Sequence, residues 1–141
     1  MKKIKLSQTQ QYFLGILMVA ILGLILLVYQ KKEFSNLLKN SRYTTGEITE
    51  YKKYLRRQDH YIFYFTLENQ KYKREIAINK SSNLFIGKRY FVIFEEGNPE
   101  NSMLIPFLFV PDSITEAPPE GWKEPPVPID KERISSFLKN Y

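Results

Sequence analysis

Residues 12–29 read YFLGILMVAILGLILLVY, eighteen residues without a charged side chain, and twelve of them are Leu, Ile, Val or Phe. As a helix rising about 1.5 Å per residue, this stretch would be roughly 27 Å long, close to the ~30 Å hydrocarbon core of a bilayer. Each of the twelve favours insertion by about 0.3 to 0.6 kcal/mol at the helix centre, and no charge opposes them. We therefore expect a transmembrane helix over residues 12–29, preceded by a basic flank over residues 1–11.

Aromatic and basic residues mark the borders of this stretch. Tyr12 and Tyr29 stand at its two ends, where interfacial aromatic side chains lie, and Lys31 and Lys32 follow directly. Residues 1–40 contain six lysines and one glutamate, so most of the net charge of +6 flanks the apolar stretch. Attraction to anionic headgroups explains this placement more simply than attraction to phosphodiesters. We expect the lipid bilayer as a partner and no nucleic acid.

A cleaved signal peptide is the main alternative, because Lys2 and Lys3 supply a basic start. However, the apolar stretch is longer than the about 7 to 15 residues of a signal peptide, and no small-x-small cleavage site follows it. A buried helix of a soluble domain would normally keep a polar stripe. We therefore favour an uncleaved, single-pass membrane anchor. Lysines lie on both sides of this anchor, so the positive-inside rule does not tell on which side of the membrane the β domain lies. The helix has no small-xxx-small motif, and its oligomeric state stays open.

The pattern changes twice after the apolar stretch. Residues 30–42 continue with helical spacing as a juxtamembrane helix. From residue 43 the sequence alternates, and we expect a first strand reaching about Tyr54, a turn over residues 55–59 and a second strand over residues 60–67. In the second strand the alternation places Tyr61, Phe63, Phe65 and Leu67 on one face, which we expect to be the core. These features predict a small β domain over residues 43–105.

A hairpin is expected to follow the second strand. If Asn69-Gln70 forms a two-residue turn, Leu67 pairs with Tyr72, Phe63 with Ile76 and Tyr61 with Ile78. This register leaves Arg74 opposite Phe65, where a guanidinium could stack on the ring or extend to the rim.

Two more strands complete the expected sheet. Residues 79–88 form a polar loop that holds the apolar triplet Leu84-Phe85-Ile86, followed by an apolar strand over residues 89–94. A strong turn signal over residues 95–99 leads into a short strand over residues 102–105. The fold class we predict is mainly β, a five-stranded antiparallel sheet that is barrel-like or strongly coiled.

The tail has a different composition. Six of the eight prolines lie between Pro106 and Pro126, which predicts an extended Pro-rich segment over residues 106–128. A short amphipathic C-terminal helix over residues 129–141 should follow, with Asp130 as its N-cap. Trp122 either pins the extended segment to the sheet or is a half-exposed linker residue.

The order of these segments carries a resemblance. Gly46-x-Ile48 opens the first strand, Gly87-Lys88-Arg89-Tyr90 leads into the apolar strand, and the late turn reads Glu96-Gly97-Asn98-Pro99-x-x-Ser102. Over residues 44–105 the chain resembles a family of small membrane-tethered β domains of unknown function. The family pattern has transmembrane helices flanking the domain, whereas Met103 to Val110 is too short to span and contains a proline. The resemblance implies architecture and no activity.

Known catalytic patterns are missing from the sequence. There is no cysteine, and His60 is the single histidine, so neither a metal-ligand set nor a Ser/His or Cys/His arrangement is present. No Gly-rich phosphate loop occurs. We predict no enzyme, no catalytic, metal or cofactor-binding residues, and a structural or solvent-facing His60.

One basic and aromatic cluster stands out. It comprises Lys52, Lys53, Arg56 and Arg57 with Tyr51 and Tyr54. These residues could contact anionic headgroups or a partner, or less readily single-stranded nucleic acid. A solvated hairpin end is the simpler interpretation, and it is the one we favour.

The predicted function is a non-catalytic accessory or protein-binding module at a bacterial-type membrane, with an unidentified protein partner. The alternatives are a membrane-bound immunity or stress protein that neutralises a toxin, and an enzyme with an unrecognised site.

Overall fold

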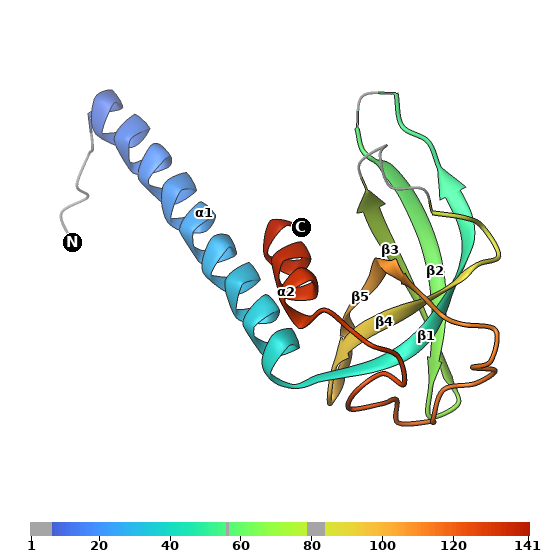
Figure 1. Ribbon diagram of the computed structural model, residues 1–141. Helices are drawn as coiled ribbons and strands as arrows, with labels where there is room; N and C mark the ends of the chain where they lie inside the picture. The colour runs from blue at the N-terminus through green and yellow to red at the C-terminus, as the bar shows by residue number, and fades with distance from the viewer. Residues whose placement is uncertain (1–6, 56, 79–83) are drawn as a thin grey trace. The chain divides into compact units, whose positions relative to one another are not determined.

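The computed structural model describes residues 7–55, 57–78 and 84–141 (Figure 1). Its elements follow the predicted order of a long helix, five strands and a short C-terminal helix. They are α1 (Gln8–Lys39), β1 (Ser41–Lys52), β2 (Asp59–Leu67), β3 (Gln70–Ile78), β4 (Arg89–Glu95), β5 (Asn98–Phe109) and α2 (Lys131–Asn140). The chain divides into two compact units, residues 1–35 and residues 36–141.

Helix α1 is continuous over 32 residues, so the predicted membrane stretch and juxtamembrane helix form one element. Its large apolar side chains from Tyr12 to Tyr29 are all exposed. The helix is long and apolar enough to cross a membrane, a property that signal sequences near an N-terminus share. Only its last turn belongs to the second unit, where Leu37 is buried. The helix ends at Lys39, three residues before the predicted boundary.

The five strands form one antiparallel sheet in the order β3-β2-β1-β4-β5, curled into a half-barrel (Figure 1). Strand β1 is central: its first half pairs with β4 and its second half with β2. Gly46 lies where both pairings overlap, and a Cβ there would stand 2.6 Å from Cγ2 of Val92. The missing side chain lets the curled sheet approach itself closely, as glycines in strongly bent strands do.

The inward face of the sheet carries the main hydrophobic core, as the alternation in the second strand predicts. Phe63, Phe65 and Leu67 are buried there, and Tyr61 packs against them half-exposed. The other members of the core are Ile48, Ile76, Ile78, Leu84, Tyr90, Val92, Phe94 and Leu104. Strand β4 is buried on both faces, as its continuous apolar run predicts. Within the loop triplet, Leu84 joins this core, whereas Phe85 and Ile86 are exposed.

The predicted β2–β3 register was wrong by two residues. The turn consists of Glu68 and Asn69, both with positive φ, and Leu67 pairs with Gln70. Positive φ at both central residues is the type I′ geometry, whose twist matches the flanking strands. Because the shift is two residues, every side chain keeps its predicted face. Arg74 therefore faces Phe63 and reaches Glu100 of β5, with 3.2 Å between Nη1 and Oε2.

The last strand is longer than the sequence predicts. It continues to Phe109, so the β domain extends past residue 105 and Pro106 belongs to the sheet instead of the extended segment. Strand β5 lies at an edge, and its register jumps between the pairs Val92–Leu104 and Tyr90–Phe109. Pro106 falls within this bulge, one of the few places in a sheet where a missing N–H is tolerated.

Helix α2 covers the opening between the edge strands β3 and β5. Asp130 caps it as predicted, because its Oδ1 accepts the Arg133 N–H at 2.9 Å. Phe137 stacks edge-on against Phe107 of β5 and packs on the core. On the other side, the hydroxyl of Tyr141 accepts the N–H of Ala77 in β3 at 2.7 Å. The Tyr141 hydroxyl thereby pairs a backbone N–H on the edge strand β3 that could otherwise pair with a strand of another chain.

Candidate functional site

The predicted basic cluster lies at the turn between β1 and β2. Lys52 ends β1, Lys53 and Arg57 are exposed in the turn, and Arg56 lies outside the described residues. The aromatic members are already in contact within the domain. Tyr51 stacks on Tyr61 at 5.0 Å and donates its hydroxyl to Asp59 at 2.8 Å, while Tyr54 meets the edge of the His60 ring at 4.8 Å.

The remaining predicted residues are placed as follows. Tyr12, Tyr29, Lys31 and Lys32 are exposed on α1, and their role at a membrane interface stays a prediction. The imidazole of His60 lies 2.6 Å from the Glu75 carboxylate on the next strand. Its neighbours fit the predicted structural role.

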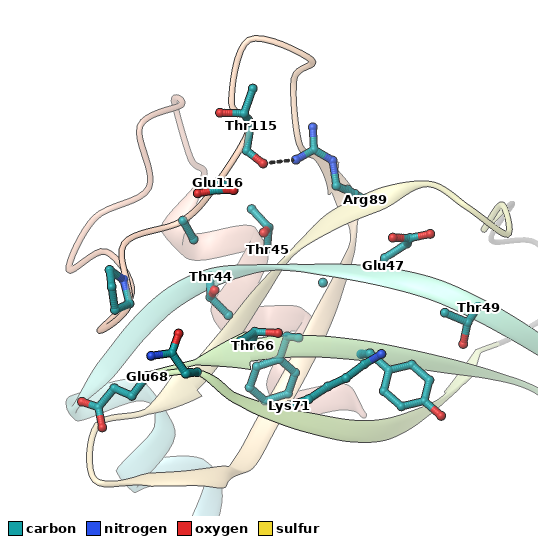
Figure 2. A pocket seen from close by; sticks show the side chains of 16 residues that line it. Thr44, Thr45, Glu47, Thr49, Thr66, Glu68, Lys71, Arg89, Thr115 and Glu116 are labelled. Carbon is teal, nitrogen blue, oxygen red and sulfur yellow. Dashed lines mark hydrogen bonds between the residues drawn. The ribbon is translucent and has the colours of Figure 1, made fainter.

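A groove of about 550 Å³, which the sequence did not predict, lies on the outward face of the sheet (Figure 2). Strands β1 and β2 form its floor, and residues 115–119 of the Pro-rich segment form the opposite wall. The floor presents alternate residues of the two strands, which point away from the core by the period-two rule. Its lining includes Thr45, Glu47, Thr49, Tyr64 and Thr66.

The wall of the groove is held at both ends. Arg89 of β4 donates from Nη1 to the carbonyl of Thr115 at 2.9 Å, a contact drawn in Figure 2. Four residues on, the carbonyl of Pro119 accepts the N–H of Glu68 in the β2–β3 turn at 2.9 Å. Prolines restrict the backbone of this segment further. The groove therefore has a preformed shape, with its wall fixed at both ends by hydrogen bonds.

The Pro-rich segment is fastened to the sheet just beyond the groove. Tyr43 and Trp122 exchange two backbone hydrogen bonds of 2.8 and 2.7 Å. Gly121 has φ +74, and a Cβ there would stand 2.6 Å from the Tyr43 carbonyl oxygen. The Trp122 ring lies 5.9 Å from that of Phe91. These contacts support the first of the two roles considered for Trp122, a pin that attaches the extended segment to the sheet.

Both signs of charge line the groove. Glu47, Glu68 and Glu116 supply carboxylates, and Lys71 and Arg89 supply cations. The ammonium of Lys71 lies 4.4 Å from the centre of the Tyr64 ring, so part of its charge is directed at an aromatic face. Together with the threonine hydroxyls, these groups offer hydrogen-bond donors and acceptors along the whole groove.

Within the part of the chain that the structure describes, no three His, Cys, Asp or Glu side chains converge as metal ligands would. The raised pKa values belong to tyrosines and Lys131. Burial raises the pKa of Tyr43 and of Tyr61, and the bond to Asp59 raises that of Tyr51. At the domain surface, the ion pair between Glu124 and Lys131 lowers the carboxyl pKa and raises the ammonium pKa. None of these groups lines the groove.

The sequence carries weak signals of this groove. Thr45, Glu47 and Thr49 alternate on the solvent side of β1, as polar residues do on any exposed sheet face. What defines the groove is the return of residues 115–119 across that face, and Gly121-Trp122 is the one local hint of where the segment docks. Comparisons with known protein families, with curated proteins and with solved structures found no match to this chain.

Proposed function

We propose that the protein is a non-catalytic binding module, anchored in a membrane by α1 as a single-pass helix, and that its groove receives a segment of a partner protein. The observation that carries the proposal is the preformed groove between the sheet and residues 115–119. Anchoring rests on the length, composition and exposure of α1.

The chemistry of the groove favours a polypeptide over a small molecule. Small-molecule sites are mostly apolar cavities with a few polar groups. This groove is open and has threonine hydroxyls, carboxylates and cations along its length. Surfaces that bind proteins transiently have this mixed polar character, and they accept bridging water. A partner segment with both backbone hydrogen-bonding groups and charged side chains would match it.

Site-specific cross-linking in intact membranes tests this proposal. A photo-reactive phenylalanine analogue placed at Thr66 or Glu116, both in the groove, should give a discrete adduct larger than the chain. The same analogue at Ser136, exposed on α2 outside the groove, is the matched control.

A blocking substitution sharpens the test. Thr49→Tyr adds bulk at an exposed position on the groove floor, where an aromatic residue suits a strand. It should reduce the adduct at Thr66 while the domain stays folded, although it removes the hydroxyl that donates to the Ile62 carbonyl at 3.5 Å. If the groove positions yield no more adduct than Ser136, or if Thr49→Tyr leaves the adduct unchanged, the groove is not the binding surface.

A further inference from the structure

The turn between β1 and β2 carries an apolar side chain in full contact with solvent. Leu55 is 98% exposed, the highest value among the large apolar residues that the structure describes. A single exposed leucine is ordinary on a protein surface. Its significance here depends on the charges around it.

Those charges are mostly positive. Residues 51–58 contain four basic side chains and no carboxylate. Among the described residues, Lys52, Lys53 and Arg57 form no ion pair within 4.0 Å. Two acids flank the turn: Glu50, two residues before Lys52, is exposed, whereas Asp59 is buried and accepts the hydroxyl of Tyr51. The turn is therefore a net positive end of the sheet.

A second loop presents apolar residues at the same end of the sheet. Phe85 and Ile86 are 54% and 60% exposed, and they precede the exposed Lys88. Backbone bonds attach this loop to β1, because Gly87 donates to the Ile48 carbonyl at 2.7 Å and Ile48 donates to the Lys88 carbonyl at 3.2 Å. These apolar side chains are thus held on the surface by the fold.

The combination fits a lipid surface better than a nucleic acid. Stacking on bases needs free aromatic faces. The rings of Tyr51 and Tyr54 already pack on Tyr61 and His60. Exposed Leu, Phe and Ile beside Lys and Arg are the residue types that enter the boundary between headgroups and acyl chains, where anionic lipids attract the cations.

We propose that this end of the sheet, comprising the described residues of the β1–β2 turn (residues 52–55 and 57) and the loop residues 85–88, docks on the anionic surface of the bilayer that holds α1. Strand β1 begins directly after α1 and advances about 3.3 Å per residue, so the turn lies roughly 36 Å along the strand from Ser41. Tethering by α1 supplies a high local concentration, so a weak contact is sufficient.

The test uses the absence of cysteine from the chain. A single environment-sensitive dye is attached to a Leu55→Cys variant of the full chain in nanodiscs, made of phosphatidylcholine alone or mixed with phosphatidylglycerol, with a quencher on the lipid headgroups. Thr66→Cys, at the opposite end of β2, is the control label.

The proposal predicts strong quenching of the Leu55→Cys dye in anionic discs, weak quenching in phosphatidylcholine, and weak quenching of the Thr66→Cys dye in both. Replacing Lys52, Lys53 and Arg57 by Gln should weaken the contact roughly fivefold per charge, about a hundredfold together. Unchanged Trp122 emission verifies that the variant is folded.

Equal quenching of the Leu55→Cys dye in the two lipids would overturn the proposal. Quenching that develops only when empty anionic vesicles are added would also overturn it, because the contact would then be to an opposing bilayer. Cross-linking in the groove is measured independently of this contact, so a negative result here would not contradict the proposed binding of a partner segment in the groove.

Discussion

Replacing Gly121 by Ala should detach the Pro-rich segment from the sheet. Gly121 has φ +74, which costs a residue with a Cβ about 1 to 2 kcal/mol. The new Cβ would also stand 2.6 Å from the backbone oxygen of Tyr43 and 2.9 Å from the Phe94 ring. A backbone oxygen within a sheet cannot move aside cheaply, and overpacking of this kind costs about 1 to 3 kcal/mol. The expected loss is therefore about 2 to 5 kcal/mol.

Gly97→Ala is the matched control. Gly97 also has positive φ, at +83, but a Cβ there would meet nothing within 4 Å. It should cost only the backbone term of about 1 to 2 kcal/mol. At roughly 4 °C per kcal/mol for a unit of this size, the unfolding temperature should fall by about 8 to 20 °C for Gly121→Ala and about 4 to 8 °C for Gly97→Ala.

Trp122 provides a direct readout, because it is the single tryptophan and follows Gly121. Thermal unfolding of the full chain in detergent, followed by Trp122 fluorescence, gives both the midpoint and the environment of the ring. Gly121→Ala should shift the native emission to the red, whereas Gly97→Ala should not. If the two variants have equal midpoints and the native emission of both is unchanged, then the segment is not seated on the sheet as described.

Three further predictions concern the domain. Leu138→Ala should cost about 2 to 5 kcal/mol in urea unfolding because Leu138, on the inner side of α2, is fully buried, while exposed Lys139→Ala should cost almost nothing. Equal losses would contradict the docking of α2. A double-mutant cycle with Arg74→Gln and Glu100→Gln should give a coupling energy of about 0.2 to 1 kcal/mol, and salt should reduce it because both side chains are partly exposed. Zero coupling at low salt would mean that this ion pair does not stabilise the contact between β3 and β5. Burial raises the pKa of Tyr43 above its unfolded value, so the contribution of this group to stability is complete below about pH 10 and is lost as pH rises through the folded pKa. The unfolding temperature should fall over that pH range, and it should fall less steeply in Tyr43→Phe. An identical fall in both proteins would exclude this tyrosine as a cause.

The fold was largely predictable because its local patterns agree with one another. Alternation assigned the core face of β2, and the expected cap at Asp130 is present. The sequence predicts the wrong β2–β3 register because moving the two-residue turn by one residue shifts the pairing by two, which satisfies the same alternation, and φ at Glu68 and Asn69 decides between the two registers. Pro106 was placed outside the sheet because an edge-strand bulge that accepts proline leaves no local mark in the sequence.

The candidate groove was beyond sequence reasoning for a different reason. It joins strands β1 and β2 to residues 115–119, which are separated from β2 in the chain by three strands, β3, β4 and β5. Contacts between such distant segments depend on tertiary packing, which residue periodicity does not encode. The basic turn at Lys52 and Lys53 is predictable from sequence, because a charge run is a local property, but the position of Phe85 and Ile86 beside the second half of β1 depends on the backbone bonds at Ile48.

Membrane anchoring by α1 is tested most directly by alkaline carbonate extraction of native membranes, followed by the intact mass of the extracted chain. If α1 is an uncleaved anchor, the chain stays in the membrane pellet and its mass includes residues 12–29 together with the β domain. Recovery of a shorter chain in the soluble fraction, cut near residue 30, would contradict membrane anchoring and with it the proposed docking of the domain on the same bilayer.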